Sequence, residues 1–291
     1  MKKLLVAVAV ILFFANVSLA DLRTFELVGS VSNSDHAAVV KSVEGALSGD
    51  FKVIATYNPG NIEDLTVLVV EYKPYFDAVD KVGRYAFYAV PLRVGVQKKG
   101  DVNNVMFVNP VYLVDAFASG KSKLEKVAKE TKKALEQALS KVSGIKVENK
   151  PFGYSTTPDE IGNWQMMGQS IYTVYEVGPK YGSMDKALEA LNQALDKGVN
   201  GWKKVYEVRF NDAIVVGISN PKYEKEAFEI GGDDHLCAFP IELVIYKNGE
   251  IKALPEMYRM SLYFMDAGMS AFAAHMSMPG EIDSSIKGLL K

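Results

Sequence analysis

The feature that most constrains the fold is a stretch of sequence that recurs further along the chain. Residues 82–96 and 231–245 align without a gap at a constant offset of 149 positions. The identical pairs are Gly83/Gly232, Ala89/Ala238 and Pro91/Pro240. Self-similarity of this kind is the mark of a structural unit that is used more than once. We therefore expect two tandem copies of one unit.

The region before each recurring stretch matches as well, at an offset of 148, and predicts a helix in each copy. The corresponding apolar residues are Val40, Val43 and Leu47 in the first copy and Leu188, Leu191 and Leu195 in the second. Their i, i+3, i+7 spacing places them on one helix face. Asp35 and Ser183 fall at the expected N-cap positions, and Gly49 and Gly198 at the expected ends.

Strands and further helices complete each unit as strand, helix, four strands, helix. The predicted opening strands are 24–31 and 171–177, the next pairs of strands are 51–57 with 65–72 and 202–210 with 213–218, and the closing helices are 124–142 and roughly 258–275. Proline-bearing loops are expected at 73–75 and 220–223. The predicted organisation is a signal peptide (1–20), a first repeat domain (21–148), a linker (149–170) and a second repeat domain (171–291).

These residues carry a resemblance to a known family. The valine-rich strand, the Asn-Pro-like loop, the polar crossover and the strands at 91–96 and 240–245 resemble the domain-of-unknown-function 302 family. The resemblance covers nearly the whole chain after residue 20, as two copies. It implies an α+β fold similar to half of the TATA-binding protein, in which a curved antiparallel sheet carries helices on one face. It implies no activity and no catalytic residues.

The first twenty residues have the three parts of a secretory signal. Lys2 and Lys3 precede an apolar run from Leu4 to Ala15, and the small residues Ser18 and Ala20 mark a cleavage site before Asp21. The alternative, an uncleaved anchor, needs about 20 apolar residues, and this run is shorter. We expect an exported protein of the periplasm or the cell exterior, with no membrane span after cleavage.

Composition excludes several classes of function. A formal net charge of -2 among 291 residues gives no basic surface for nucleic acid, so no nucleic-acid partner is expected. Cys237 is the only cysteine, so an internal disulfide is not possible. The sequence has no nucleophile elbow, zinc-protease helix, phosphate-binding loop or dinucleotide fingerprint. A binding protein is therefore favoured over an enzyme.

The second copy departs most from the first at residues 233–237. Asp233, Asp234, His235 and Cys237 supply carboxylate, imidazole and thiol groups, all of which bind metals. The C-terminal region adds His275, Met276 and Met278, which are ligands suited to copper or haem. The simpler interpretation is a polar turn followed by a buried cysteine, with Met265, Met269, Phe272 and Met276 forming one buried helix stripe.

Aromatic residues are the other candidates for binding. Tyr85 and Tyr88 are candidate ligand-binding residues, and a cleft between the copies lined by them would favour a small ligand, with Asp233 and Asp234 as further ligand-binding residues. The simpler interpretation is that strand alternation places half of these aromatic residues in the core. Arg93 and Glu242 occupy equivalent strand positions with opposite charge, which permits a contact between the copies. The sequence thus favours an exported protein that binds a small ligand or a protein partner and is built as an intramolecular pseudo-dimer. The alternative is a copper or haem protein of the cell envelope that uses the second copy.

Overall fold

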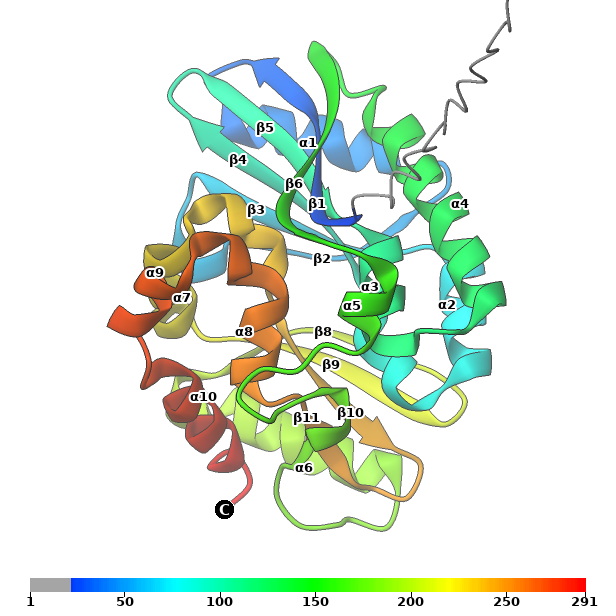
Figure 1. Ribbon diagram of the computed structural model, residues 1–291, viewed down its shortest axis with the longest axis vertical. Coiled ribbons are helices and arrows are strands. Elements are labelled where there is room, and N and C mark those ends of the chain that lie inside the picture. The colour runs from blue at the N-terminus through cyan, green and yellow to red at the C-terminus, as the bar shows by residue number, and fades with distance from the viewer. Residues whose placement is uncertain (1–21) are drawn as a thin grey trace, which may run out of the picture.

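The computed structural model describes residues 22–291, so the predicted signal peptide at 1–20 lies outside the described residues. The N-terminal half forms a six-stranded antiparallel sheet in the order β2-β3-β4-β5-β1-β6 (Figure 1). Its strands are β1 (Leu22–Ser32), β2 (Lys52–Tyr57), β3 (Leu65–Glu71), β4 (Leu92–Lys99), β5 (Val102–Val108) and β6 (Ile145–Thr156).

The C-terminal half forms a second antiparallel sheet of five strands in the order β7-β11-β10-β9-β8. Its strands are β7 (Tyr175–Glu176), β8 (Lys203–Arg209), β9 (Ala213–Ser219), β10 (Ile241–Tyr246) and β11 (Ile251–Ala253). Together with helices on the faces of the sheets, this architecture confirms the predicted α+β fold.

Ten α-helices of the described chain cover the sheets. They are α1 (His36–Leu47), α2 (Lys73–Val82), α3 (Pro110–Ala118), α4 (Ser122–Leu139), α5 (Pro158–Gly162), α6 (Met184–Asp196), α7 (Pro221–Gly231), α8 (Glu256–Phe264), α9 (Met269–Ala274) and α10 (Met278–Lys287). Two 3-10 helices connect helix and strand at matching places in the halves, η2 (Arg84–Ala89) and η5 (Asp233–Ala238).

The caps predicted for the first helix of each half are confirmed. The Asp35 side chain accepts a hydrogen bond from the Ala38 N–H, and the Ser183 side chain accepts one from the Lys186 N–H. Each bond satisfies a backbone donor that has no partner within the helix. After α6, Gly198 adopts a φ of 64°, a left-handed conformation that suits glycine at the end of a helix.

The prediction of proline-bearing loops at 73–75 and 220–223 was wrong, because helices α2 and α7 begin at these residues. A proline stands in the first turn of each helix, where its missing N–H costs no internal hydrogen bond. The side chain of Asn220 also accepts a hydrogen bond from the Lys222 N–H as an N-cap.

Two predicted elements of the C-terminal half differ from the structure. The strand expected at 171–177 is a 3-10 turn followed by the two-residue strand β7. The helix expected at 258–275 is divided into α8, a 3-10 turn and α9. Gly268 has a φ of 81°, which an α-helix does not accommodate, so the expected methionine stripe does not lie along one helix.

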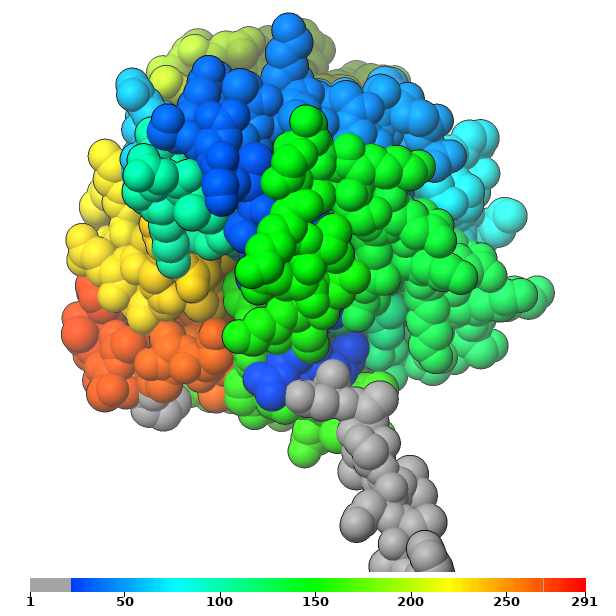
Figure 2. All heavy atoms as spheres, turned by 90° about the horizontal axis from the view of Figure 1, so that it is seen from above, coloured from blue at the N-terminus to red at the C-terminus, as the bar shows by residue number. Residues whose placement is uncertain are grey.

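Each sheet is covered on one face by helices of its own half and on the other face by the opposite half. Helix α1 lies on the first sheet and α4 packs against α1, while the other face of the sheet contacts η5. Helix α6 lies on the second sheet, whose β9 and β10 contact η2. In Figure 2 the teal and green segments of the N-terminal half lie directly against the yellow and orange segments of the C-terminal half. Strand β3 is consequently buried along nearly its whole length, and β9 along all of it.

Within residues 22–291, no helix combines the length and the apolar character that crossing a bilayer requires.

Candidate functional site

The residues predicted for ligand binding in the second copy, Asp233 and Asp234, contact the first sheet. The side-chain amide of Gln97 on β4 donates hydrogen bonds to Asp233 at 2.8 Å and to Asp234 at 2.9 Å. Lys99 lies 2.6 Å from Asp234, and this pair is about half exposed. Lys99 and Gln97 hold the pKa of Asp234 below its usual value, although partial burial opposes them. These carboxylates thus join the halves.

Cys237 is fully buried where η5 crosses β4. A Cβ atom on Gly95 would lie 2.8 Å from the Cys237 Sγ atom and 3.0 Å from Leu236. This close approach needs glycine at position 95. Burial raises the pKa of the Cys237 thiol to about 12, so the thiolate form that binds metals is disfavoured.

The histidines proposed as metal ligands have separate partners. His235 Nε2 lies 2.9 Å from Asp266, and its ring stacks on Phe264 with centroids 5.0 Å apart. His275 Nδ1 lies 3.5 Å from Glu226. Among residues 22–291, no three His, Cys, Asp or Glu side chains form a group that could hold a metal ion. The structure therefore does not gather His235, Cys237 and His275 into one ligand set.

The predicted methionine ligands also separate from each other. Met278 is fully buried in α10, whereas Met276 is 47% exposed. Met276 lines a small cavity of about 40 Å³ whose lining is entirely apolar. The remaining lining residues are Met166, Met167, Met257, Met265 and Phe272.

Tyr85 and Tyr88 do not share an open cleft. Tyr88 is 1% exposed and packs near Phe117, with ring centroids 6.2 Å apart. Tyr85 is half-buried, packs edge-on against Tyr172 and lines a shallow depression of about 470 Å³. Only Tyr85 is thus accessible to a ligand from solvent.

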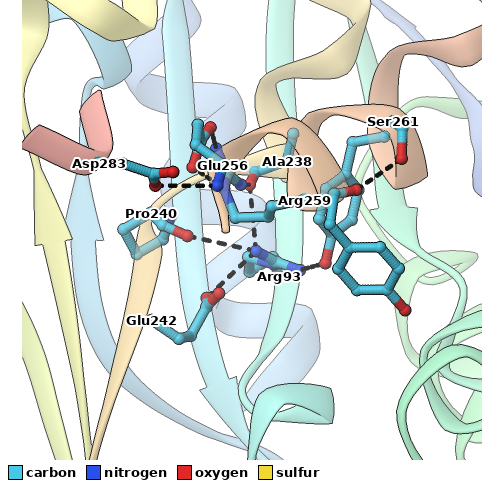
Figure 3. A network of polar contacts seen from close by, with 10 residues as sticks. Arg93, Ala238, Pro240, Glu242, Glu256, Arg259, Ser261 and Asp283 are labelled. Atoms are coloured by element: carbon cyan, nitrogen blue, oxygen red, sulfur yellow. Dashed lines mark hydrogen bonds and ion pairs between the residues drawn. The ribbon is translucent and has the colours of Figure 1, made fainter. Parts of the chain in front are cut away.

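A buried polar network lies between the two halves, centred on Arg93 (Figure 3). Arg93 of β4 is 1% exposed, and its Nη1 atom lies 3.2 Å from the Glu242 carboxylate of β10. The same nitrogen donates to the carbonyl oxygens of Ala238 and Pro240 at 3.3 and 3.4 Å, and Nη2 donates to the Tyr263 hydroxyl at 2.7 Å. The alignment of equivalent strand positions permitted this Arg93–Glu242 contact, and it is present.

A second buried arginine extends the network. Arg259 of α8 forms a bidentate pair with Glu256, both bonds being 2.9 Å. Its Nη1 atom donates to the Ala238 carbonyl at 2.6 Å, so Arg93 and Arg259 share one acceptor. Buried charges are tolerated when they are paired and hydrogen-bonded. Because this network connects the two halves of the molecule, we call it the joint.

An open cleft lies in the N-terminal half, away from this network. It has a volume of about 600 Å³ and is bounded by β1, β6, α3, α4 and α5. Its polar lining includes Glu26, Asn109, Asp115, Glu125, Lys129, Lys132 and Asp159, and its apolar lining includes Leu22, Val111, Pro151 and Pro158. A concave site with an apolar wall and convergent polar groups is the usual form of a small-molecule site.

One side of the cleft holds a paired carboxylate. Glu26 of β1 is 4% exposed and lies 2.6 Å from the Lys132 Nζ atom of α4. The Asn109 side-chain amide donates to the same Glu26 oxygen at 3.3 Å. Burial raises the pKa of Glu26, and the nearby Lys132 opposes this rise. This side of the cleft is thus fixed by a charge-assisted contact.

The other side holds an unpaired carboxylate. Asp115 of α3 is 5% exposed, and no group in residues 22–291 donates a hydrogen bond to its carboxylate or forms an ion pair with it. Burial raises the pKa of Asp115 to about 6, with Glu125 adding to the rise and Lys129 opposing it. Buried carboxylates without partners are rare, and shifted pKa values concentrate at functional sites.

Glu26 and Asp115 were not among the predicted site residues, although each has a recognisable sequence context. Asp115 is the only charged residue between Val105 and Ala118, and Glu26 interrupts the apolar strand that begins the fold. A single carboxylate inside an apolar run is informative because charged residues are rarely buried without cause. Lys129 and Lys132 lie in a lysine-rich segment that also contains Glu125, Glu130 and Glu136, a pattern that is equally typical of a solvated helix face.

Comparisons with known proteins find similarity to solved structures but not to family models or curated sequences. No family model and no curated protein matches the sequence significantly. Two chains of solved structures match, among them the crystal structure of an uncharacterized conserved protein DUF302 from Bacillus stearothermophilus. It is 16% identical, covers 39% of this chain and 95% of that chain, and has a TM-score of 0.34. This is the family that the sequence resembles, and at this TM-score the similarity supports no conclusion about ligand or activity.

Proposed function

We propose that this chain is a small-ligand binding protein whose ligand site is the cleft between β1, β6 and helices α3 to α5. The observation that carries the proposal is the Asp115 carboxylate, which is buried at the cleft without a partner. The cost of burying an unpaired charge persists in a folded protein when function requires the group.

We also propose that the scaffold is a tandem repeat packed as an intramolecular pseudo-dimer. Contacts that are exchanged between equivalent positions support this arrangement. Gln97 on β4 bonds to Asp233 of η5, and Tyr246 on β10 donates to the Arg84 carbonyl of η2 at 3.4 Å. Adding the repeat offset of 149 to positions 97 and 84 gives positions 246 and 233. Such reciprocity is the property of a two-fold interface.

The Arg93–Glu242 pair supports the same proposal. These residues are themselves equivalent at the offset of 149, and they contact each other directly. In a two-fold arrangement, a residue that contacts its own equivalent lies on the axis. Opposite charges at this position turn what would be a repulsive contact between identical residues into an ion pair. This explains how the copies diverged while they continued to pack together.

The sequence of residues 1–20 supports the further proposal that the protein is exported. Cleavage after Ala20 would leave Asp21 as the first residue, directly before β1. Mass spectrometry of the protein from its native cell tests this, because a mature chain beginning at Asp21 in the extracytoplasmic fraction is expected. An intact Met1 in the cytoplasm contradicts export.

A fragment screen by ligand-observed NMR tests the binding site. Hits are mapped by amide chemical shift changes in the ¹⁵N-labelled protein. We expect the changes to concentrate at Asn109, Val111 and Ser119, which line the cleft. Shift changes confined to the depression beside Tyr85, or the absence of any hit at millimolar concentration, contradict the proposed site.

A second candidate function is the binding of a soft metal ion at the methionine-lined cavity. Five thioethers surround a space of about 40 Å³, and thioethers prefer Cu(I). This ligand set differs from the one centred on His235 and Cys237. Titration with Cu(I) against a chromogenic competitor should give one site that a Met257→Leu, Met265→Leu variant loses. Met106→Leu, on β5 and outside the cavity, is the control.

A further inference from the structure

The charges around the cleft are unbalanced. Its lining contains the four carboxylates Glu26, Asp115, Glu125 and Asp159 but only the two lysines Lys129 and Lys132. Lys132 is already engaged, because it pairs with Glu26 at 2.6 Å and approaches Glu136 at 3.8 Å. The cleft is therefore negative overall, and it opposes an anionic ligand.

The carboxylates of the cleft differ in what they can still bind. Glu26 has a lysine and an amide as partners, and Asp159 is exposed to solvent near the Asn163 side chain. Asp115 is the buried carboxylate that retains all its acceptor capacity. Lys129 of α4 acts on Asp115 only through space, and Glu125 on the same helix opposes it. Asp115 can thus accept hydrogen bonds from a donor that enters the cleft.

We propose that the cleft binds a small organic amine, whose ammonium group forms a charge-assisted pair with Asp115. This inference rests on the proposed function of the cleft and names its ligand class. The carbon chain of the amine packs on the apolar wall made by Leu22, Val111, Pro151 and Pro158. A compact ammonium group has three donors, which suits a carboxylate with no other partner.

Binding of a cation requires the ionised form of Asp115, so the affinity depends on pH. Because the pKa of Asp115 is raised to about 6, the carboxylate is mostly ionised at pH 7.5 and mostly protonated at pH 5. The affinity therefore falls as the pH decreases through about 6. The other charged groups around the carboxylate are Glu125 and Lys129 on α4 and Asp159 on α5.

The test uses three probes with one carbon skeleton: butylamine, 1-butanol and butyrate. Isothermal titration of the full chain at pH 7.5 should detect butylamine alone. Asp115→Asn should weaken butylamine binding about tenfold or more, because a hydrogen bond to a charged group is lost. Asp185→Asn, at an exposed carboxylate on α6, is the matched control and should leave the affinity unchanged.

A second variant tests the inference independently of how Asp115→Asn folds. Lys129→Met removes the cation that acts on Asp115, so it should strengthen butylamine binding several-fold. Unchanged or weaker binding in this variant contradicts the inference.

The outcomes separate the inference from the proposed function. Binding of butyrate or butanol in the cleft, with none of butylamine, overturns the amine inference and leaves a small-molecule site in place. Butylamine binding that Asp115→Asn does not weaken also overturns the inference. If none of the three probes binds, the amine inference is wrong, and the fragment screen alone decides whether the cleft is a site.

Discussion

Two regions of the molecule bury carboxylates, and they do so in opposite ways. Between the halves, Glu242 is buried against Arg93, which has four further acceptors or aromatic contacts around its guanidinium group. In the cleft, the Asp115 side chain is also largely buried, but its carboxylate lines the open space and no described group donates to it. The first region is closed by protein, and the second opens on a space of about 600 Å³.

The difference indicates which buried charges serve the fold and which remain for a ligand. A buried ion pair adds little net stability, but removing one member leaves the other charge buried without a partner. An unpaired charge lowers stability as long as it is ionised. The two regions should therefore respond to substitution with opposite signs.

The largest effect is expected from Arg93→Met. It leaves Glu242 buried without its partner, and it should lower the free energy of unfolding by about 3–5 kcal/mol. Denaturant unfolding measures this change. Arg209→Met is the matched control, because its pair with Asp185 is exposed and should contribute about 1 kcal/mol or less. Equal losses in both variants contradict the account of the joint, whereas partial recovery in Arg93→Met, Glu242→Leu supports it.

Two glycine substitutions test how closely the two halves pack on each other. Gly95→Ala places a Cβ atom against Cys237 and Leu236, and it should cost about 1–3 kcal/mol because the halves must move apart. Gly45→Ala, in α1 with open space around the position, should instead stabilise by about 0.5–1 kcal/mol. Thermal unfolding of both variants measures the difference. If Gly95→Ala leaves the unfolding temperature unchanged, η5 is not closely packed on β4.

Asp115→Asn should raise stability at neutral pH by about 1–2 kcal/mol, the opposite sign to the joint. The folded pKa of about 6 exceeds the unfolded value, so the folded state binds the proton more tightly. Wild-type stability is therefore favoured below about pH 4 and decreases as the pH rises to about 6. The variant lacks this decrease. Unfolding curves at pH 4 and 7 measure it, and an equal difference at both values contradicts the burial of an unpaired charge.

The smallest effect is expected at the exposed rim of the joint. Lys99→Met removes the half-exposed pair with Asp234, and it should cost about 1 kcal/mol or less. The loss should disappear at high salt, because exposed charges are screened. Denaturant unfolding at low and high salt checks both points. A loss as large as that of Arg93→Met would place the main joint at η5 instead of at the Arg93–Glu242 pair.

Much of the fold could be predicted, because periodic apolar residues and caps are local features. The helix beginning after Asp35 and the strand predicted at 65–72, observed at 65–71, follow from spacing, whereas the antiparallel α+β class was implied by the family resemblance. Helices α2 and α7 could not be predicted in this way, because a proline at the start of a helix has the same sequence pattern as a proline in a loop. Gly268 could have indicated the break before α9, but a glycine inside a helical pattern is often tolerated.

The site was harder to predict, because it depends on what lies opposite each residue. Asp233 to Cys237 attracted attention for their chemistry, yet they pack on Gln97, Lys99 and Gly95, which are distant in the sequence. Asp115 was overlooked inside an apolar helix, because burial without a partner is visible only in three dimensions.

The most direct test of the contrast is the titration of Asp115 itself, followed by the carboxyl ¹³C resonance with and without butylamine. The account predicts a midpoint near pH 6 in the free protein, which decreases when the amine binds because the ammonium group stabilises the ionised form. A midpoint near the ordinary value of about 3.9 in the free protein would contradict the claim that this carboxylate is buried without a partner.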